Sequence, residues 1–301
     1  MAAVATAFNF IIGADRKLRP IWRAILWALL TVFVAMPLLG MLLDLVIGPE
    51  PPGQFAFSPA NLSLAEGFNF ACALIVTAAF AFYERRRIDS YGMPLSSALK
   101  SPTWEGFALG VVQPAIVAFA MIAYGAMQVR GLAQPGAASL VWALAWLGAC
   151  LAIGIAEEFL FRGYFLQTLW KAIGFWPASA VVAAIFAGVH YALKPGENLA
   201  DMITLVSFSL LCCYSVLRTG NLWFAVGFHV AYDFMQLFVI GTPNGGLIPV
   251  GRLLDVSFNG PAWLTGGSLG TEASWLGYPL DILAFLFIWW RYRKNPNFVP
   301  R

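Results

Sequence analysis

The stretch of sequence that decides the fold is LVWALAWLGACLAIGIAEEFLFRGYFLQTLWK, residues 140–171. It is longer than the roughly 20 apolar residues that a helix needs to cross a bilayer. It also contains two adjacent carboxylates, Glu157 and Glu158, followed by Arg162. A charge near the middle of a bilayer is costly, so such groups usually face a protein partner or a water-filled cavity. The stretch therefore predicts a membrane-spanning helix that contributes to a buried polar site.

The composition of the whole chain also indicates an integral membrane protein. Of its 301 residues, 60% are hydrophobic and 11% are charged, and the mean hydropathy is +0.75. Soluble domains are about 25% charged. The cations lie at the ends of apolar segments, so the net charge of +3 indicates no nucleic-acid partner. The four cysteines lie in apolar runs without metal-binding spacing, and we expect them to pack as small hydrophobes.

Eight apolar segments predict an all-α, polytopic membrane protein with about eight transmembrane helices. These segments are 20–45, 65–83, 105–127, 140–171, 177–193, 199–218, 222–240 and 278–292. We expect one transmembrane domain over residues 1–301, with its motif-bearing core at about 140–240. The Gly-rich segment 241–277 is expected to be a long external loop, which either caps the outer face or only connects two spans.

The distribution of Lys and Arg predicts the orientation, because cytoplasmic loops carry an excess of these residues. Fourteen of the 18 fall on the side of the N-terminus, three fall on the other side, and Arg162 lies within a span. We therefore expect both termini in the cytoplasm. The pattern fits a bacterial inner membrane and also the endoplasmic reticulum.

The two histidines of the chain lie in apolar segments, at a depth close to that of the paired carboxylates. Glu157 lies 17 residues before Gly174 and His190 lies 16 residues after it, so both sit about 25 Å from that turn at 1.5 Å per residue. His229 and Asp233 lie roughly 14 and 20 Å along their own helix. We interpret these side chains as one site inside the membrane.

Helical spacing suggests how these groups pair. Glu158 and Arg162 are four residues apart and share a helix face. Glu157 is turned by about 100° from Glu158, and a carboxylate directed away from that pair suits a general base. The same spacing joins His229 to Asp233.

Phe186 and His190 also lie four residues apart, so Phe186 could pack beneath the imidazole. Each of these pairs could instead serve only to fix helix packing. Four other acids of the spans lie near span ends and are expected to be interfacial. They are Asp44, Glu66, Glu105 and Asp281.

The three motifs together resemble those of the CPBP intramembrane protease family. That family includes the type II CAAX prenyl endopeptidases and the Abi bacteriocin-immunity proteins. The matching patterns are Glu-Glu-x-x-x-Arg at 157–162, Phe-x-x-x-His at 186–190 and His-x-x-x-Asp at 229–233. The resemblance covers about residues 140–240 and implies peptide-bond hydrolysis at a site inside the bilayer.

The resemblance also implies a role for each residue. Glu157 with His190 would activate water, while His229 with Asp233 would stabilise the oxyanion or help to hold a metal. Glu158 and Arg162 would brace the site, with Phe186 in support. The prenyl endopeptidases have Asn at the position of Asp233, and a carboxylate, unlike an amide, only accepts hydrogen bonds.

A metal ion, if present, would be held by Glu157, His190, His229 and Asp233, and zinc is the first expectation. A metal-free glutamate mechanism is the alternative that the family offers. The zincin pattern HExxH is absent from the sequence.

We therefore expect an intramembrane endopeptidase that cleaves a membrane-associated protein or peptide. The candidate substrates are a membrane-anchored peptide, a bacteriocin leader or a lipidated tail. Two alternatives remain open: a non-catalytic immunity or scaffold protein with the same fold, and a proton-coupled transporter, in which intramembrane acids and histidines form a proton relay.

Overall fold

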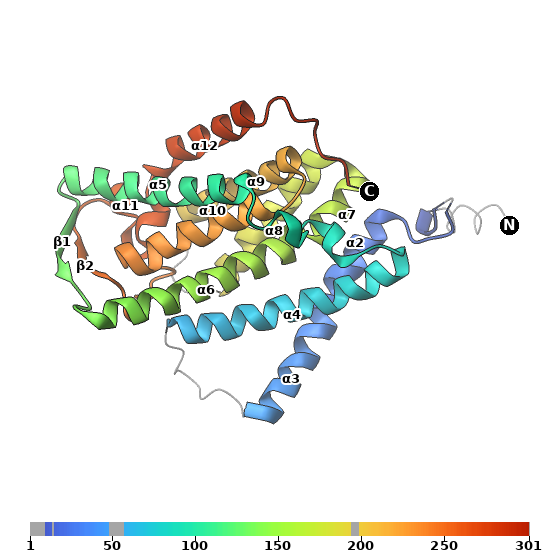
Figure 1. Cartoon of the computed structure of the whole chain (residues 1–301), viewed down its shortest axis with the longest axis horizontal. Helices are drawn as coiled ribbons and strands as arrows, with labels where there is room; N and C mark the ends of the chain where they lie inside the picture. Colours follow the sequence, from blue (N-terminus) through green and yellow to red (C-terminus); the bar gives the residue numbers. More distant parts are fainter. Residues whose placement is uncertain (1–9, 14, 48–56, 194–198, 301) are drawn as a thin grey trace.

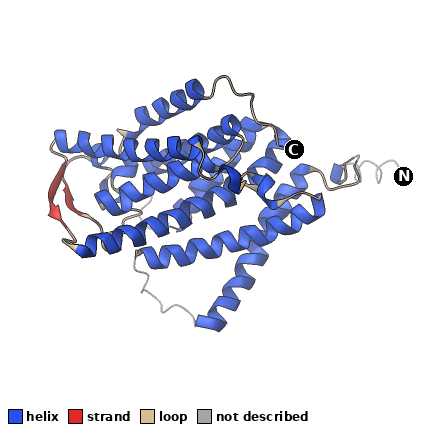
Figure 2. Ribbon diagram, in the orientation of Figure 1, coloured by secondary structure: helices blue, strands red, loops and turns tan. Residues whose placement is uncertain are grey.

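The computed structural model describes residues 10–13, 15–47, 57–193 and 199–300 (Figure 1). Helices make up most of the described chain (Figure 2). The long helices and the π-helical segments that continue two of them are α2 (Pro20–Leu30), η1 (Thr31–Ala35), α3 (Met36–Ile47), α4 (Pro59–Glu84), α5 (Ser101–Ala123), α6 (Ala137–Arg162), α7 (Tyr164–Ile173), α8 (Phe175–Leu193), α9 (Leu199–Thr219), α10 (Trp223–Asp233), η4 (Phe234–Ile240) and α12 (Gly277–Arg291). Shorter turns of helix are η2 (Ile88–Tyr91), η3 (Leu95–Ser97), α11 (Ala262–Thr265), η5 (Gly267–Leu269) and η6 (Thr271–Ala273).

The all-α polytopic architecture predicted from the sequence is confirmed, with seven helices rather than eight of sufficient length. Over the described residues, these seven candidate spans are Pro20–Leu45, Pro59–Glu84, Ser101–Ala123, Ala137–Ile173, Phe175–Leu193, Asp201–Thr219 and Trp223–Ile240. The eighth expected span, 278–292, is helical as α12, but α12 has only 15 residues. At 1.5 Å per residue it is about 22 Å long, which is shorter than the hydrocarbon core of about 30 Å.

Glycines set the break and the turn that follow the carboxylate motif. Gly163 separates α6 from α7, and a Cβ there would lie 2.4 Å from the carbonyl oxygen of Phe159. Gly174 ends α7 with a φ of +87°, and α8 begins at the next residue with Pro177 in its first turn. A left-handed glycine followed by proline is a common way to end one helix and begin another. The turn expected at Gly174 is therefore present.

Helix α5 packs closely against α10, the helix that carries His229. A Cβ at Gly106 would lie 2.1 Å from the carbonyl oxygen of Phe224, and a Cβ at Gly227 would lie 2.1 Å from that of Thr103. Gly110 makes a similar approach four residues after Gly106. Small residues at this spacing let membrane helices pack backbone against backbone. The position of α10 therefore depends on glycines of two helices.

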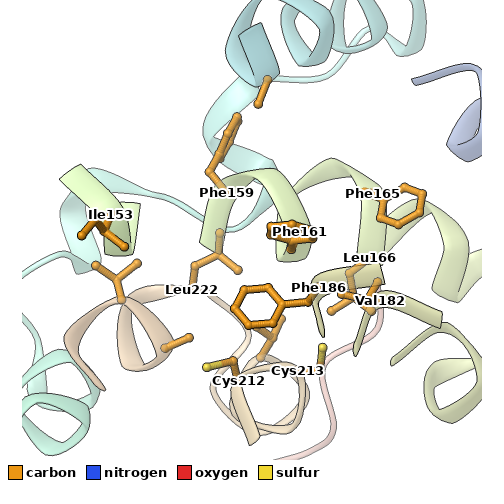
Figure 3. Packing of buried hydrophobic residues seen from close by; sticks show 14 of the residues in the cluster. Ile153, Phe159, Phe161, Phe165, Leu166, Val182, Phe186, Cys212, Cys213 and Leu222 are labelled. Carbon is orange, nitrogen blue, oxygen red and sulfur yellow. The ribbon is translucent and has the colours of Figure 1, made fainter. Parts of the chain in front are cut away.

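Aromatic and sulfur-containing side chains fill the space between α6, α8 and α9. The ring of Phe186 lies close to Phe161, with ring centroids 5.1 Å apart, and Figure 3 shows it beside Cys212 and Cys213. All four cysteines of the chain are buried and free. Their predicted role as small packing residues agrees with this burial.

A folded cap lies at the end of the bundle where α5 leads into α6 (Figure 1). Strand β1 (Met127–Leu132) pairs antiparallel with β2 (Leu254–Phe258), so the segment 241–277 adds a strand to the connection between two spans. Trp146 of α6 donates a hydrogen bond from Nε1 to the carbonyl oxygen of Val250 at 3.0 Å. Gly251 has a φ of +72°, and a Cβ there would lie 2.0 Å from the ring of Trp142. The segment 241–277 is therefore a packed cap rather than a plain connector.

At the opposite end of the bundle, one carboxylate joins four elements. Glu84, at the end of α4, lies 2.8 Å from Arg23 of α2 and accepts hydrogen bonds from the hydroxyl groups of Tyr91 (3.0 Å) and Tyr164 (2.6 Å). Glu84 is buried, so these partners compensate its charge. This network fixes the end of the bundle away from the cap.

Candidate functional site

The carboxylate motif on α6 forms the buried base of the site. Glu158 and Arg162 both have fully buried side chains, and Arg162 Nη1 lies 3.2 Å from Glu158 Oε1. Arg162 Nη2 also donates a hydrogen bond of 2.7 Å to Ser209 Oγ of α9. The pair expected from the spacing is therefore present, and its guanidinium connects α6 to a second helix.

His229 of α10 lies at the junction of three carboxylates. Its Nδ1 is 2.9 Å from Glu158 Oε1. Its Nε2 is 3.8 Å from Glu157 Oε2 and 3.7 Å from Asp233 Oδ2. The spacing predicted the neighbour on the same helix, Asp233, whereas the two contacts with α6 depend on how the helices are rotated.

Glu157 and Glu158 face different surroundings, as their angular separation on the helix predicts. The side chain of Glu158 is fully buried between Arg162 and His229. The side chain of Glu157 is 15% exposed, that of Asp233 is 21% exposed, and both line a cavity. Glu158 therefore belongs to the support of the site, while Glu157 is accessible to a reactant.

His190 of α8 is oriented by its own helix. Its Nδ1 lies 2.9 Å from the carbonyl oxygen of Phe186, and the two rings pack with their centroids 4.5 Å apart. Because a carbonyl oxygen only accepts hydrogen bonds, Nδ1 carries the proton in the neutral ring, and the lone pair lies on Nε2. The packing of Phe186 beneath the imidazole, expected from the spacing, is present.

Phe186 also joins the second motif to the first. The guanidinium carbon of Arg162 lies 4.6 Å from the centre of the Phe186 ring, within the range of a cation–π contact. On the same side, Phe208 of α9 lies 6.2 Å from Phe186 and 4.8 Å from His229, measured between ring centroids. These contacts form an aromatic support beneath both histidines.

Residues from each of the three motifs line a cavity of about 130 Å³. The four predicted catalytic residues, Glu157, His190, His229 and Asp233, all line it together with Phe186. Glu158 and Arg162 are not among the residues that line it. The structure thus separates residues that a reactant in the cavity could touch from residues that hold them.

The cavity is also lined by polar residues for which the sequence predicted no role in the site. They are Glu66 of α4, Asp201 and Thr204 of α9, Tyr232 of α10, and Asn244 and Glu272 of the cap. Glu66, which we expected near the membrane interface, lines the cavity because α4 packs along α6. Asp281, for which we had the same expectation, is 6% exposed and accepts a hydrogen bond from Gln113.

The expected metal site was tested against the arrangement of donor groups. Among the residues that the structure describes, no group of three or more His, Cys, Asp or Glu side chains is placed to hold a metal ion. Glu157, His190, His229 and Asp233 line one cavity but do not converge as such a group. The zinc ligand set remains a prediction from the resemblance, and no step below depends on it.

Fold and site together define a class of protein: a polytopic α-helical membrane protein with carboxylates and imidazoles around a cavity between its helices. Residues 138–235 match the family model described as "Type II CAAX prenyl endopeptidase Rce1-like". This match confirms the resemblance to the CPBP/CAAX protease family and covers all three motifs and the helices α6 to α10 that carry them. Neither a curated protein nor a solved structure matches the chain.

Proposed function

We propose that the chain is a CAAX-type intramembrane endopeptidase that hydrolyses a peptide bond of a membrane-associated protein or peptide. The observation that carries the proposal is the position of His229 between Glu157, Glu158 and Asp233, beside a cavity that His190 also lines. Intramembrane charges that converge in this way usually mark a functional site. The family match over the same helices supports hydrolysis rather than transport.

The first step is the activation of water by Glu157. Its carboxylate would accept a proton from a water molecule in the cavity, and that water would attack the carbonyl carbon of the scissile bond. The Nε2 lone pair of His190 would accept the second hydrogen bond of the water and direct its oxygen toward the substrate. Phe186 keeps the imidazole in the tautomer that this role requires.

The second step is the stabilisation of the tetrahedral oxyanion. His229, held from Nδ1 by Glu158, would donate a hydrogen bond from Nε2 to the developing negative charge. Asp233, which lies 3.7 Å from that nitrogen, would orient the ring and balance its charge in the imidazolium form. The C–N bond then breaks, and Glu157 returns its proton to the leaving amine.

Arg162 has a positioning role in this scheme. Its guanidinium neutralises Glu158, which in turn holds His229, and it packs on Phe186, which holds His190. One buried cation therefore supports both imidazoles without reaching the cavity. Its replacement would disturb two catalytic groups at once.

We also propose that both ends of the chain lie in the cytoplasm. The basic clusters around Arg23, Arg86 and Lys171 lie at the end of the bundle away from the cap. α12 returns the chain to the end of the bundle from which α2 begins (Figure 1). The excess of Lys and Arg at this end supports a cytoplasmic side, which would place the cap on the opposite face of the membrane.

The proposed activity is tested by comparing the protein fragments in membranes that contain the wild-type chain or Glu157→Gln. Mass spectrometry of new peptide termini should detect fragments that depend on the wild-type chain and disappear with the variant. Asp44→Asn is the matched control, because Asp44 is exposed on α3 and does not line the cavity. If Glu157→Gln produces the same new termini as the wild type, the proposal is wrong.

A further inference from the structure

The cavity has a strongly acidic lining that hydrolysis alone does not require. The carboxylates that line it are Glu66, Glu157, Asp201, Asp233 and Glu272. Two of them, Glu157 and Asp233, belong to the proposed mechanism. The other three come from α4, α9 and the cap, so separate parts of the chain contribute acidic groups to the same space.

Among the residues that the structure describes, no lysine or arginine lines this cavity. Arg162 lies behind Glu158, with a fully buried side chain. The two described cations of the cap, Arg130 and Arg252, both lie near Asp255, at 3.4 and 3.3 Å. Of the described side chains that line the cavity, His190 and His229 are the ones that can carry positive charge. A positively charged group of a substrate would therefore complement the cavity.

Glu272 is held in the cavity wall by hydrogen bonds from a neighbouring side chain. Asn244 Nδ2 lies 3.0 Å from Oε1 and 2.9 Å from Oε2 of Glu272, and Asn244 also lines the cavity. The neighbouring Thr271 donates hydrogen bonds from its backbone nitrogen to Thr242 and from its hydroxyl group to Gln236 of η4. The carboxylate is therefore positioned by the cap and by the helix that continues from Asp233.

The backbone of the cap is also tightly packed at Gly270, two residues before Glu272. A Cβ at Gly270 would lie 2.0 Å from Thr242 Oγ1 and 2.6 Å from the carbonyl oxygen of Pro243, and Gly270 has a φ of +80°. The segments that carry Asn244 and Glu272 consequently pack directly on each other. Rigid packing of this kind around a recognition group keeps that group in place.

We propose that Glu272 is a specificity-determining residue that selects substrates with a positively charged side chain close to the scissile bond. The inference rests on the proposed function for the position of the scissile bond. Opposite charges across a binding surface favour the correct partner, and like charges reject others. Anionic segments would therefore be excluded by the same lining that accepts a Lys or Arg side chain.

Binding can be measured without turnover in the Glu157→Gln background, with the full chain in nanodiscs of uncharged phosphatidylcholine. The probes are three N-palmitoylated, C-terminally amidated decapeptides of neutral residues that differ only by Lys, Gln or Glu at one central position. The lysine peptide should bind at least about tenfold more tightly than the glutamate peptide, which corresponds to about 1.4 kcal/mol. Glu272→Gln should reduce this preference at least about threefold, and Glu272→Lys should reverse it.

Asp255→Asn is the matched control, because it removes a carboxylate from the same cap without changing the lining of the cavity. It should leave the preference unchanged. Equal affinities for the three peptides, or a lysine preference that survives Glu272→Gln, would overturn the assignment. Glu272→Gln keeps an oxygen for Asn244 to bind, so its result stands even if Glu272→Lys disturbs the cap.

The same peptides separate this inference from the proposed function when the native Glu157 is restored. Tighter binding of the lysine peptide than of the glutamate peptide, without any cleavage, would refute the proposed hydrolysis and leave the role of Glu272 intact. Cleavage of all three peptides at equal rates would support hydrolysis and refute charge selection.

Discussion

Replacement of Arg162 by methionine tests whether one buried cation supports both imidazoles. The side chain is fully buried and lies 3.2 Å from Glu158, 2.7 Å from Ser209 Oγ and 4.6 Å from the ring of Phe186. Methionine fills a similar volume but carries no charge. Glu158 would then keep His229 as its partner at 2.9 Å, but it would lose Arg162, the partner that is always positively charged.

The expected loss of stability is about 3 kcal/mol. Removal of one partner from a buried ion pair costs about 3–5 kcal/mol, because the remaining charge stays buried, and the contact of His229 with Glu158 favours the lower end of that range. The double variant Glu158→Gln, Arg162→Met should regain at least about 1.5 kcal/mol of this loss, since it leaves no uncompensated charge. Arg130→Met is the control: its ion pair with Asp255 is largely exposed, and we expect a change of less than about 1 kcal/mol.

The assay is reversible unfolding of the purified chain in mixed micelles of dodecyl maltoside and increasing dodecyl sulfate, followed by circular dichroism. All four proteins are measured under one condition, so that only differences in the free energy of unfolding are compared. The reasoning is refuted if Arg162→Met is no less stable than Arg130→Met. It is also refuted if the double variant is no more stable than Arg162→Met alone.

Three further results are expected. Gly227→Ala should destabilise the protein by more than about 2 kcal/mol in the same assay, because the added methyl group would overlap a backbone carbonyl of α5, whereas Gly148→Ala meets no atom within 4 Å and should be tolerated. Gly251→Ala should make the cap more sensitive to limited proteolysis than Gly125→Ala does, because both positions have a positive φ but only Gly251 packs on a tryptophan ring. The proposed activation of water by Glu157 and His190 predicts that cleavage stays within about twofold when 1,10-phenanthroline is added; loss of cleavage that zinc restores would instead support the zinc ligand set that the resemblance implies.

The sequence predicted the spans and the grouping of the four residues well, for a simple physical reason. Apolar runs of about 20 residues have few alternatives to a membrane helix, and a constant rise of 1.5 Å per residue converts sequence spacing into depth. Glu157, His190, His229 and Asp233 accordingly line one cavity. The expected helix at 278–292 is present but short, because the cap continues to residue 276 and leaves only 15 residues for α12.

The sequence alone could not predict the contacts between secondary-structure elements. The contact of His229 with Glu158 depends on the rotation of α10 against α6, and no local spacing encodes that rotation. Glu66 stands in no motif, and only the packing of α4 along α6 brings it to the cavity. Glu272 reaches the site because β2 pairs with β1 across more than 100 residues of chain. The Gly106-x-x-x-Gly110 spacing was the one available signal for the approach of α5 to α10.

The most direct test of the central claim is hydrolysis by the purified chain in proteoliposomes prepared in water enriched in ¹⁸O. The substrate is a membrane-anchored reporter peptide with a lysine close to the bond that is cleaved, and the product is analysed by mass spectrometry. The wild-type chain should release a fragment whose new carboxyl terminus contains one ¹⁸O atom, and Glu157→Gln should release none. Equal release by Glu157→Gln, or a product without the label, would contradict the assignment of Glu157 as the group that activates water.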